Sequence, residues 1–171
     1  MKGDILRSAS IGSVLHGKNG TILYYDGFKK LEAQISVSWG DNYDVDCCAW
    51  FYLNNGQGFV DSAYLGWNYG NTETTMNGVK MRWTGDVTSP GVEAFFLSSD
   101  GRIDPKNIVF MLGTNWYRSE YGAQACRVHC GGKSITIYPS NRKGQRADIN
   151  DPGVRITFDS QGNVDTITPR P

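Results

Sequence analysis

The sequence predicts an all-β protein, an antiparallel β-sandwich of about 8–10 short strands with little helix. Three observations predict it. Apolar and polar residues alternate with period two in several segments, as in strands that bury one face. Glycine makes up 21 of the 171 residues, well above the usual share of about 7%, and glycines gather with Asn and Asp between these segments. No window of about twelve residues keeps the 3.6-residue period of an amphipathic helix.

The clearest alternating segment is 31–39. Leu31, Ala33, Ile35, Val37 and Trp39 fall on one face, and polar residues occupy the positions between them. Side chains of a strand point to its two faces in turn, so this segment is expected to bury one face in the core. An uninterrupted apolar run at 108–112 predicts a central strand that is buried on both faces.

The remaining elements follow from turn signals and from shorter alternating runs. For 92–97 a strand is preferred over one edge of a short helix. The sequence predicts a hairpin of 11–15 with 21–25 around the turn at 17–20, and strands at 44–53, 79–83, 92–97, 123–130, 134–138, 154–158 and 164–168, the last two forming a closing hairpin. Residues 139–152, which are rich in basic side chains and have Pro at both ends, are predicted to be a linker.

Length and charge narrow the class of protein. The 171 residues fit a single domain over 1–171. Seventeen basic and seventeen acidic residues cancel, so we expect binding to neither nucleic acid nor membrane. No apolar run approaches the roughly 18–20 residues of a membrane span, and the first residues lack an apolar signal segment. A cytoplasmic location is therefore expected.

Four cysteines stand at 47, 48, 126 and 130. Cys47 and Cys48 are adjacent on a predicted strand and so point to opposite faces. Cys126 and Cys130 have looser spacing than a zinc site needs, and His129 would face away from them. A disulfide between the two regions has no oxidising compartment to support it. We therefore expect buried, structural thiols.

Enzyme motifs are missing from the sequence. It contains no nucleophile elbow, phosphate-binding glycine loop or dinucleotide fingerprint. With His16 and His129 as the only histidines, few arrangements of a nucleophile with a histidine base exist. A pair of carboxylates for glycoside hydrolysis leaves no linear signature and stays open. We expect a protein that is not an enzyme.

Oxygen-bearing side chains concentrate where the strand at 31–39 gives way to the next. Asp44 and Asp46 are two residues apart, so both carboxylates would face the same way on an extended strand. Calcium takes six to eight oxygen ligands, and loops between sandwich strands can supply them. The candidate ligands are Asp41, Asn42, Asp44 and Asp46, completed by Gly85 and Asp86 from a second loop. The alternative is ordinary turn chemistry, with Asp41 and Asn42 in an Asx turn and Asp44 paired with a basic side chain.

These residues also carry a family resemblance. The segments 35–40 and 43–53, with Asp44-Val45-Asp46 at their junction, are similar to the tellurium-resistance TerD domain. In the same order follow Gly66-Trp67-Asn68-Tyr69, Trp83-Thr84-Gly85-Asp86, the stretch 103–110, and 119–129. The resemblance covers about residues 31–140, with 1–30 as an N-terminal hairpin and 141–171 as a C-terminal strand and hairpin.

The resemblance implies a β-sandwich binding domain linked to stress response and tellurium resistance, with protein partners. Members of that family bind calcium through the Asp-x-Asp loop and a Gly-Asp-Asn loop, which implicates Asp44, Asp46 and Asp86, with Gly85 contributing backbone. Val87 stands where the family has Asn, and the following loop holds one acid. Fewer anionic ligands predict weak calcium binding.

Aromatic residues suggest an alternative function. Five tryptophans and nine tyrosines exceed what a core of this size needs. Trp39, Trp50 and Trp83 fit inward strand positions. Aromatic side chains on loops form stacking platforms for sugars or other flat ligands, and the candidates are Tyr64, Trp67, Tyr69 and Trp116. The alternative is thus a glycan-binding protein, or a virion or other structural β-sandwich that contacts only proteins.

Overall fold

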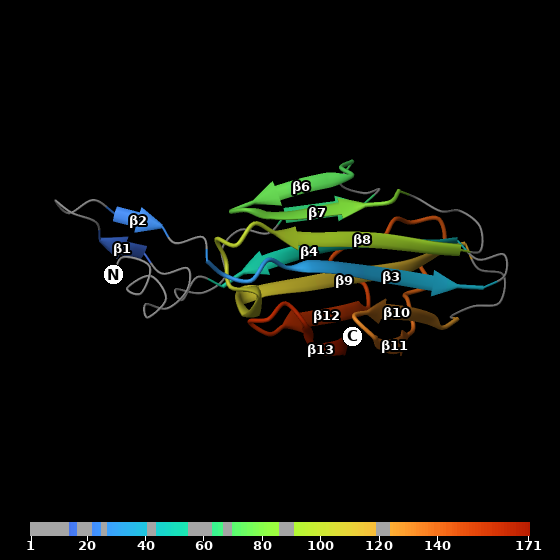
Figure 1. The fold of residues 1–171 in the computed structure, drawn as a ribbon. Helices are drawn as coiled ribbons and strands as arrows, with labels where there is room; N and C mark the ends of the chain where they lie inside the picture. Colours follow the sequence, from blue (N-terminus) through green and yellow to red (C-terminus); the bar gives the residue numbers. More distant parts are fainter. Residues whose placement is uncertain are drawn as a thin grey trace.

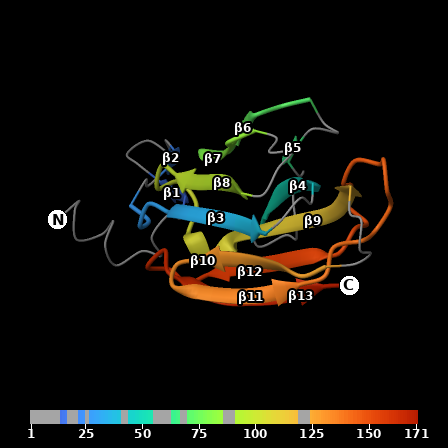
Figure 2. The ribbon, with the colours of Figure 1, turned by 90° about the vertical axis from the view of Figure 1, so that its right-hand side faces the viewer.

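The structure is a computed structural model, and it describes residues 14–16, 22–24, 27–40, 44–54, 63–66, 70–85, 91–118 and 124–171. Two antiparallel sheets pack face to face (Figures 1 and 2). The six-stranded sheet has the order β11-β10-β3-β8-β7-β6, made of Lys133–Ile137, Cys126–Cys130, Glu32–Trp39, Gly91–Ser99, Val79–Trp83 and Glu73–Met76. The five-stranded sheet has the order β13-β12-β9-β4-β5, made of Val164–Arg170, Gly153–Phe158, Ile108–Arg118, Asp44–Leu53 and Ala63–Gly66. The predicted β-sandwich is confirmed.

Three smaller elements complete the described secondary structure. β1 (Val14–His16) and β2 (Ile22–Tyr24) form a separate antiparallel pair in which Val14 lies opposite Tyr24, as the predicted N-terminal hairpin requires. A single 3₁₀ turn, η3 (Pro105–Asn107), precedes β9, and Asp104 caps it by accepting a 3.1 Å hydrogen bond from the backbone N–H of Lys106. Within the described residues, no helix is long and apolar enough to span a membrane.

The core lies between the two sheets and follows the predicted alternation. In β3, Ile35, Val37 and Trp39 are buried, and the polar positions between them face outward, because successive side chains of a strand alternate. In β8 the inward residues include Phe95 and Leu97. The preference for a strand at 92–97 is therefore confirmed.

The centre of the five-stranded sheet is the long antiparallel pair of β4 and β9, which runs in register from Leu53 opposite Ile108 to Val45 opposite Trp116. The predicted buried strand at 108–112 is confirmed, and it continues as far as Arg118.

The four cysteines are free and buried, as expected. Cys47 joins the core between the sheets, whereas Cys48 packs on the outer face of the five-stranded sheet. Burial raises the pKa of Cys126 to about 12 and that of Cys130 to about 11, so all four positions suit apolar packing better than reactivity.

Trp50 corrects one expectation about the core. It was predicted to point inward between the sheets, but the alternation of β4 puts it on the outer face of the five-stranded sheet. Trp50 is buried there because Arg170 lies 4.8 Å from its ring centroid and Tyr64 stacks on it. Trp39 and Trp83 do point into the main core.

The prediction of a linker at 139–152 is wrong. These residues, which we call the arch, pack across the outer face of the five-stranded sheet instead of connecting two independent parts. Asn115, buried in β9, donates to the backbone carbonyls of Arg142 and Gln145 and accepts from the backbone N–H of Arg142 at 2.8 Å. Gly113 permits the close approach, since a Cβ there would lie 2.4 Å from the carbonyl oxygen of Asp148.

An ion pair between the half-buried Arg142 and the buried Asp151 closes the arch on itself. Arg142 donates to both carboxylate oxygens of Asp151, which also accepts from Ser140 Oγ at 2.8 Å and from the backbone N–H of Asp148 at 2.8 Å. Burial raises the pKa of Asp151, but these hydrogen bonds outweigh it, so that pKa lies below its ordinary value. The arch is therefore a folded part of the sandwich.

Candidate functional site

The candidate cation site depends on two loops, one that runs from β3 to β4 between the sheets and one that runs from β7 to β8 within the six-stranded sheet. The described strands on either side of these loops fix where they emerge. Trp39, the last residue of β3, lies opposite Gly91, the first residue of β8. β7 ends at Trp83, and the next backbone N–H, that of Thr84, donates to Ala94 of β8 at 3.0 Å. The loops after Trp39 and after Trp83 therefore leave the sandwich at the same end, which we call the loop end (the right-hand end in Figure 1).

Asp44 lies at the loop end, directly after the loop that follows β3. It is the first residue of β4, is buried, and lies opposite Arg118 at the end of β9. A β-bulge between Asp44 and Val45 shifts the register, and a bulge re-aims the side chains beside it. The simple alternation that was expected to align Asp44 with Asp46 therefore does not hold at this point.

Asp46 has a structural role that the sequence did not reveal. Its side chain is 2% exposed and faces the arch, where Oδ2 accepts a 2.8 Å hydrogen bond from the backbone N–H of Ala147. Oδ1 lies 3.8 Å from Nη1 of Arg146. A carboxylate already held by a guanidinium and a backbone N–H is poorly placed to ligate a second cation. Asp46 therefore does not fit the calcium set in which it was predicted.

The other predicted ligands are only partly visible. Gly85 has a φ of +103°, and a Cβ there would meet nothing within 4 Å. Asp41, Asn42 and Asp86 lie outside the described residues. Within the described residues, no group of three or more His, Cys, Asp or Glu side chains could hold a metal ion. A cation site would therefore need Asp44 together with residues of the two loops.

A buried carboxylate near the loop end escaped the sequence analysis. Glu93 in β8 is 0% exposed and points into the core, where its Oε2 accepts a 3.2 Å hydrogen bond from Nε1 of Trp83. Burial raises the pKa of Cys47 well above its ordinary value, and the nearby charge of Glu93 raises it further. The signal was available: Glu93 occupies the same strand face as Phe95 and Leu97, two residues apart each time.

Of the predicted aromatic platform, the structure describes Tyr64 and Trp116. Trp116 was placed on an exposed loop, and that is wrong: it lies within β9, is 0% exposed, and donates from Nε1 to the backbone carbonyl of Gln124 at 3.0 Å. Tyr64 is half-buried in β5 and stacks on Trp50 with ring centroids 6.2 Å apart. Trp67 and Tyr69 lie outside the described residues.

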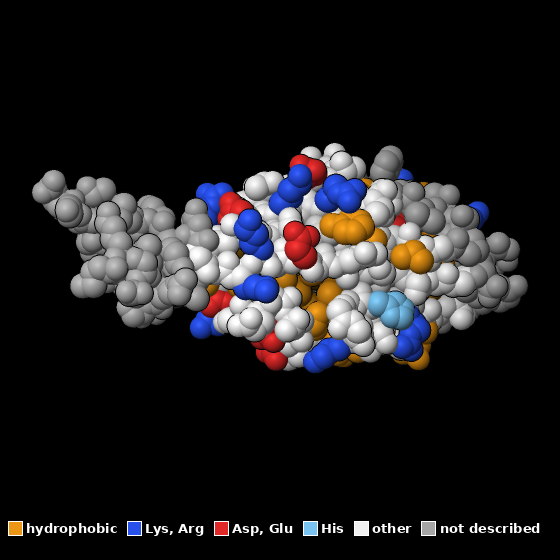
Figure 3. Space-filling view, viewed as in Figure 1, with side chains coloured by type: hydrophobic (Ala, Val, Ile, Leu, Met, Phe, Trp, Pro, Cys, Tyr) orange, Lys and Arg blue, Asp and Glu red, His pale blue; other side chains and the backbone are white. Residues whose placement is uncertain are grey.

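Charged side chains of both signs lie on the described part of the outer face of the six-stranded sheet (Figure 3). Lys, Arg, Asp and Glu side chains are interspersed over the face seen in Figure 3. Lys80 and Glu73 form an exposed ion pair of 3.2 Å, and Arg82 stacks 4.6 Å from the ring centroid of Phe96.

Comparison with family models, with curated proteins and with solved structures found no match for this chain. The resemblance to the TerD domain therefore stays a prediction from the sequence.

Proposed function

We propose that the protein is a non-enzymatic binding domain of the TerD kind, which engages its ligand at the loop end of the sandwich. The observation that supports this proposal is the shared position of the two loops, drawn from the pairing of Trp39 with Gly91 and of Thr84 with Ala94. Loops held at one end by a rigid sandwich are a common way to build a binding surface.

The proposed ligand is a divalent cation, calcium in the first instance, bound weakly. Asp44 is the anchoring carboxylate, and Asp41, Asn42 and Asp86 are the proposed partners from the two loops. Asp46 is left out of the set because it holds the arch through Arg146 and Ala147. Few anionic ligands predict low affinity, because calcium affinity follows the charge and number of its oxygen ligands.

Terbium luminescence tests this proposal directly. Terbium(III) replaces calcium at oxygen sites, and excited tryptophans nearby, such as Trp39 and Trp83, would sensitise its emission. We expect saturable emission that excess calcium displaces and that Asp86→Asn removes. The matched control is Asp165→Asn, an exposed carboxylate on β13, which should leave the emission unchanged. Equal emission from the wild type and from Asp86→Asn would refute the site.

Asp46 separates the revised ligand set from the original one. Asp46→Asn should lower the free energy of unfolding, because it removes the ion pair with Arg146, yet the folded variant should keep its terbium emission. Emission lost in folded Asp46→Asn would restore this residue to the ligand set and contradict our assignment.

A second candidate function is glycan binding, favoured by the half-buried Tyr64 stacked on Trp50. Sugars pack their apolar faces on such rings. A glycan array read with the wild type and with Tyr64→Ala would support this function if specific saccharides bound only the wild type. Saccharide binding without a terbium response would favour it over the first proposal.

A further inference from the structure

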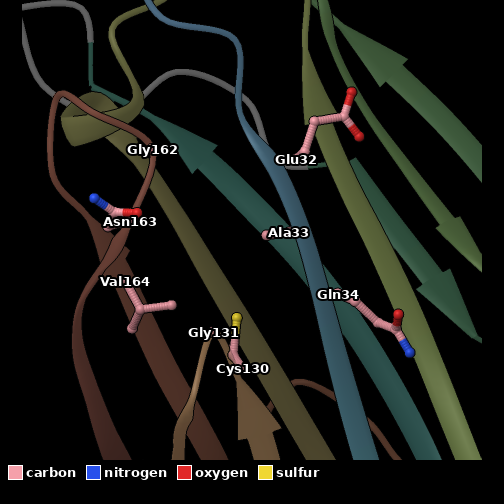
Figure 4. Close-up of a pocket in the computed structure, with 8 residues that line it drawn as sticks. All are labelled: Glu32, Ala33, Gln34, Cys130, Gly131, Gly162, Asn163 and Val164. Atoms are coloured by element: carbon pink, nitrogen blue, oxygen red, sulfur yellow. The ribbon is translucent and has the colours of Figure 1, made fainter.

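A cavity opens between the sheets at the end opposite the loops, with a volume of about 480 Å³. Figure 4 shows its residues, which come from the start of β3, the turn between β10 and β11, and the turn between β12 and β13. They are Glu32, Ala33, Gln34, Cys130, Gly131, Gly162, Asn163 and Val164. The volume falls within the roughly 300–1,000 Å³ of ligand-binding pockets. This cavity shares no residue with the loop end.

The cavity lies where the first residues of β3 have no neighbouring strand on the β10 side. β3 pairs with β8 over its whole length, from Glu32 opposite Ser98 onward. On its other side β3 pairs with β10 only from Ile35, which lies opposite Cys130. There the chain turns through Gly131 and Gly132 into β11.

Residues 32–34 therefore have a strand neighbour on one side only among the described residues. Strands carry backbone N–H and C=O groups alternately toward each side, and an unpaired side is a template for another strand. An extended segment that continued the line of β10 would run antiparallel to β3, passing Gln34, Ala33 and Glu32 in that order.

The floor of the cavity is apolar. Ala33 occupies a core-facing position between Leu31 and Ile35, both fully buried, yet it is itself half-buried because its small side chain leaves the space unfilled. Val164 and the Cys130 thiol bound the same space (Figure 4). Directly opposed residues of neighbouring strands face the same side. The residue beside Ala33 on an added strand would thus point into the cavity.

The rim is polar and carries a negative charge. Glu32 and Gln34 are exposed, and in Figure 4 both side chains point away from Val164, on the outer face of the sheet. A residue beside Glu32 on an added strand would lie on that outer face too, where opposite charges on paired positions attract. A basic residue is favoured there.

We propose that this cavity binds an extended peptide of a partner protein by strand addition to β3, with an aliphatic side chain beside Ala33 and a basic one beside Glu32. Backbone hydrogen bonds to Glu32 and Gln34, whose N–H and C=O groups face the side away from β8, supply affinity. The cavity over Val164 selects the aliphatic side chain. This division between backbone and pocket is typical of peptides that extend a sheet. The basic residue follows the aliphatic one directly, because the peptide runs antiparallel to β3.

Titration of the ¹⁵N-labelled full chain with the peptide acetyl-Ser-Thr-Leu-Lys-Ser-amide, without divalent cations, tests the proposal. We expect saturable amide shifts at Glu32–Gln34, Gly131 and Gly162–Val164. Ala33→Leu fills the cavity and should weaken binding at least tenfold. The amide spectrum of this variant should otherwise match that of the folded wild type. Thr75→Leu, which introduces the same side chain at an exposed position of β6, should bind as the wild type does. Replacing the peptide's Leu by Asp should also abolish the shifts.

Other outcomes overturn the proposal. Equal binding by wild type and Ala33→Leu, or shifts confined to other residues, would place the peptide elsewhere. Shifts of these same amides on raising the protein concentration alone would make a second copy of the chain the occupant. Because the titration contains no divalent cation, its failure leaves the terbium test of the loop end unaffected, and the reverse also holds.

Discussion

Asn115 joins the arch to the five-stranded sheet, and its replacement by alanine should measure how much that junction contributes to stability. The side chain is 0% exposed and makes three hydrogen bonds to backbone groups of Arg142 and Gln145. Each hydrogen bond of this kind contributes about 1 kcal/mol net. We therefore expect Asn115→Ala to lower the free energy of unfolding by about 3 kcal/mol.

Urea unfolding followed by tryptophan fluorescence gives this difference, and thermal unfolding gives an independent reading. For a domain of this size, about 3 kcal/mol corresponds to a fall in Tm of roughly 6–12 °C. The matched control is Asn141→Ala, an exposed asparagine of the same arch, which should change stability by less than about 0.5 kcal/mol. A loss below about 1 kcal/mol for Asn115→Ala would mean that the arch is not held as described.

Two further predictions concern the arch, and a third concerns the cysteines. The pKa of Asp151 is lower in the folded protein than in the unfolded chain, so its stabilisation is present above the unfolded value of about 3.9 and is lost as the pH falls through and below it. Thermal unfolding from pH 7 to pH 3 should therefore show a shallower decline in Tm for Asp151→Asn than for the wild type; parallel declines would contradict this. Gly113→Ala, whose Cβ would lie 2.4 Å from a carbonyl oxygen of the arch, should cost about 1–3 kcal/mol as overpacking does, and an unchanged urea midpoint would argue against the close approach. The four buried cysteines should react with a thiol reagent such as DTNB only on unfolding, and rapid reaction of native protein would show that their burial is wrong.

The alternation of apolar and polar residues predicted most of the strands. The alternation at 31–39 and 79–83 and the apolar run at 108–112 each reappear as strands, because burial of one or both faces leaves a pattern in the residues themselves. Among the described strands, β5 and β6, of four residues each, were not predicted. β6 did have a signal: Asn77 and Gly78 both have positive φ, and an Asn-Gly pair between two strands is typical of a two-residue hairpin turn.

The errors have a common physical cause, which is contact between segments far apart in the sequence. The arch looked like a linker because its residues are polar, yet their hydrogen-bonding groups are satisfied by Asn115 and Asp46. Asp46 looked like a calcium ligand because nothing near it in the sequence reveals Arg146, 100 residues later. Trp116 looked exposed because the apolar run seemed to end at Leu112. Local patterns cannot show which distant group will pair with a side chain.

The pairing of β4 with β9 also has consequences for how the chain acquires its structure. Opposed residues in this pair are between 55 and 74 positions apart, and β3 likewise finds both its neighbours, β8 and β10, much later in the sequence. Contacts between distant residues slow folding. During synthesis, more than fifty further residues must therefore be added after the apolar β4 before its partner β9 is made. In that time β4 is exposed to chaperones and to self-association.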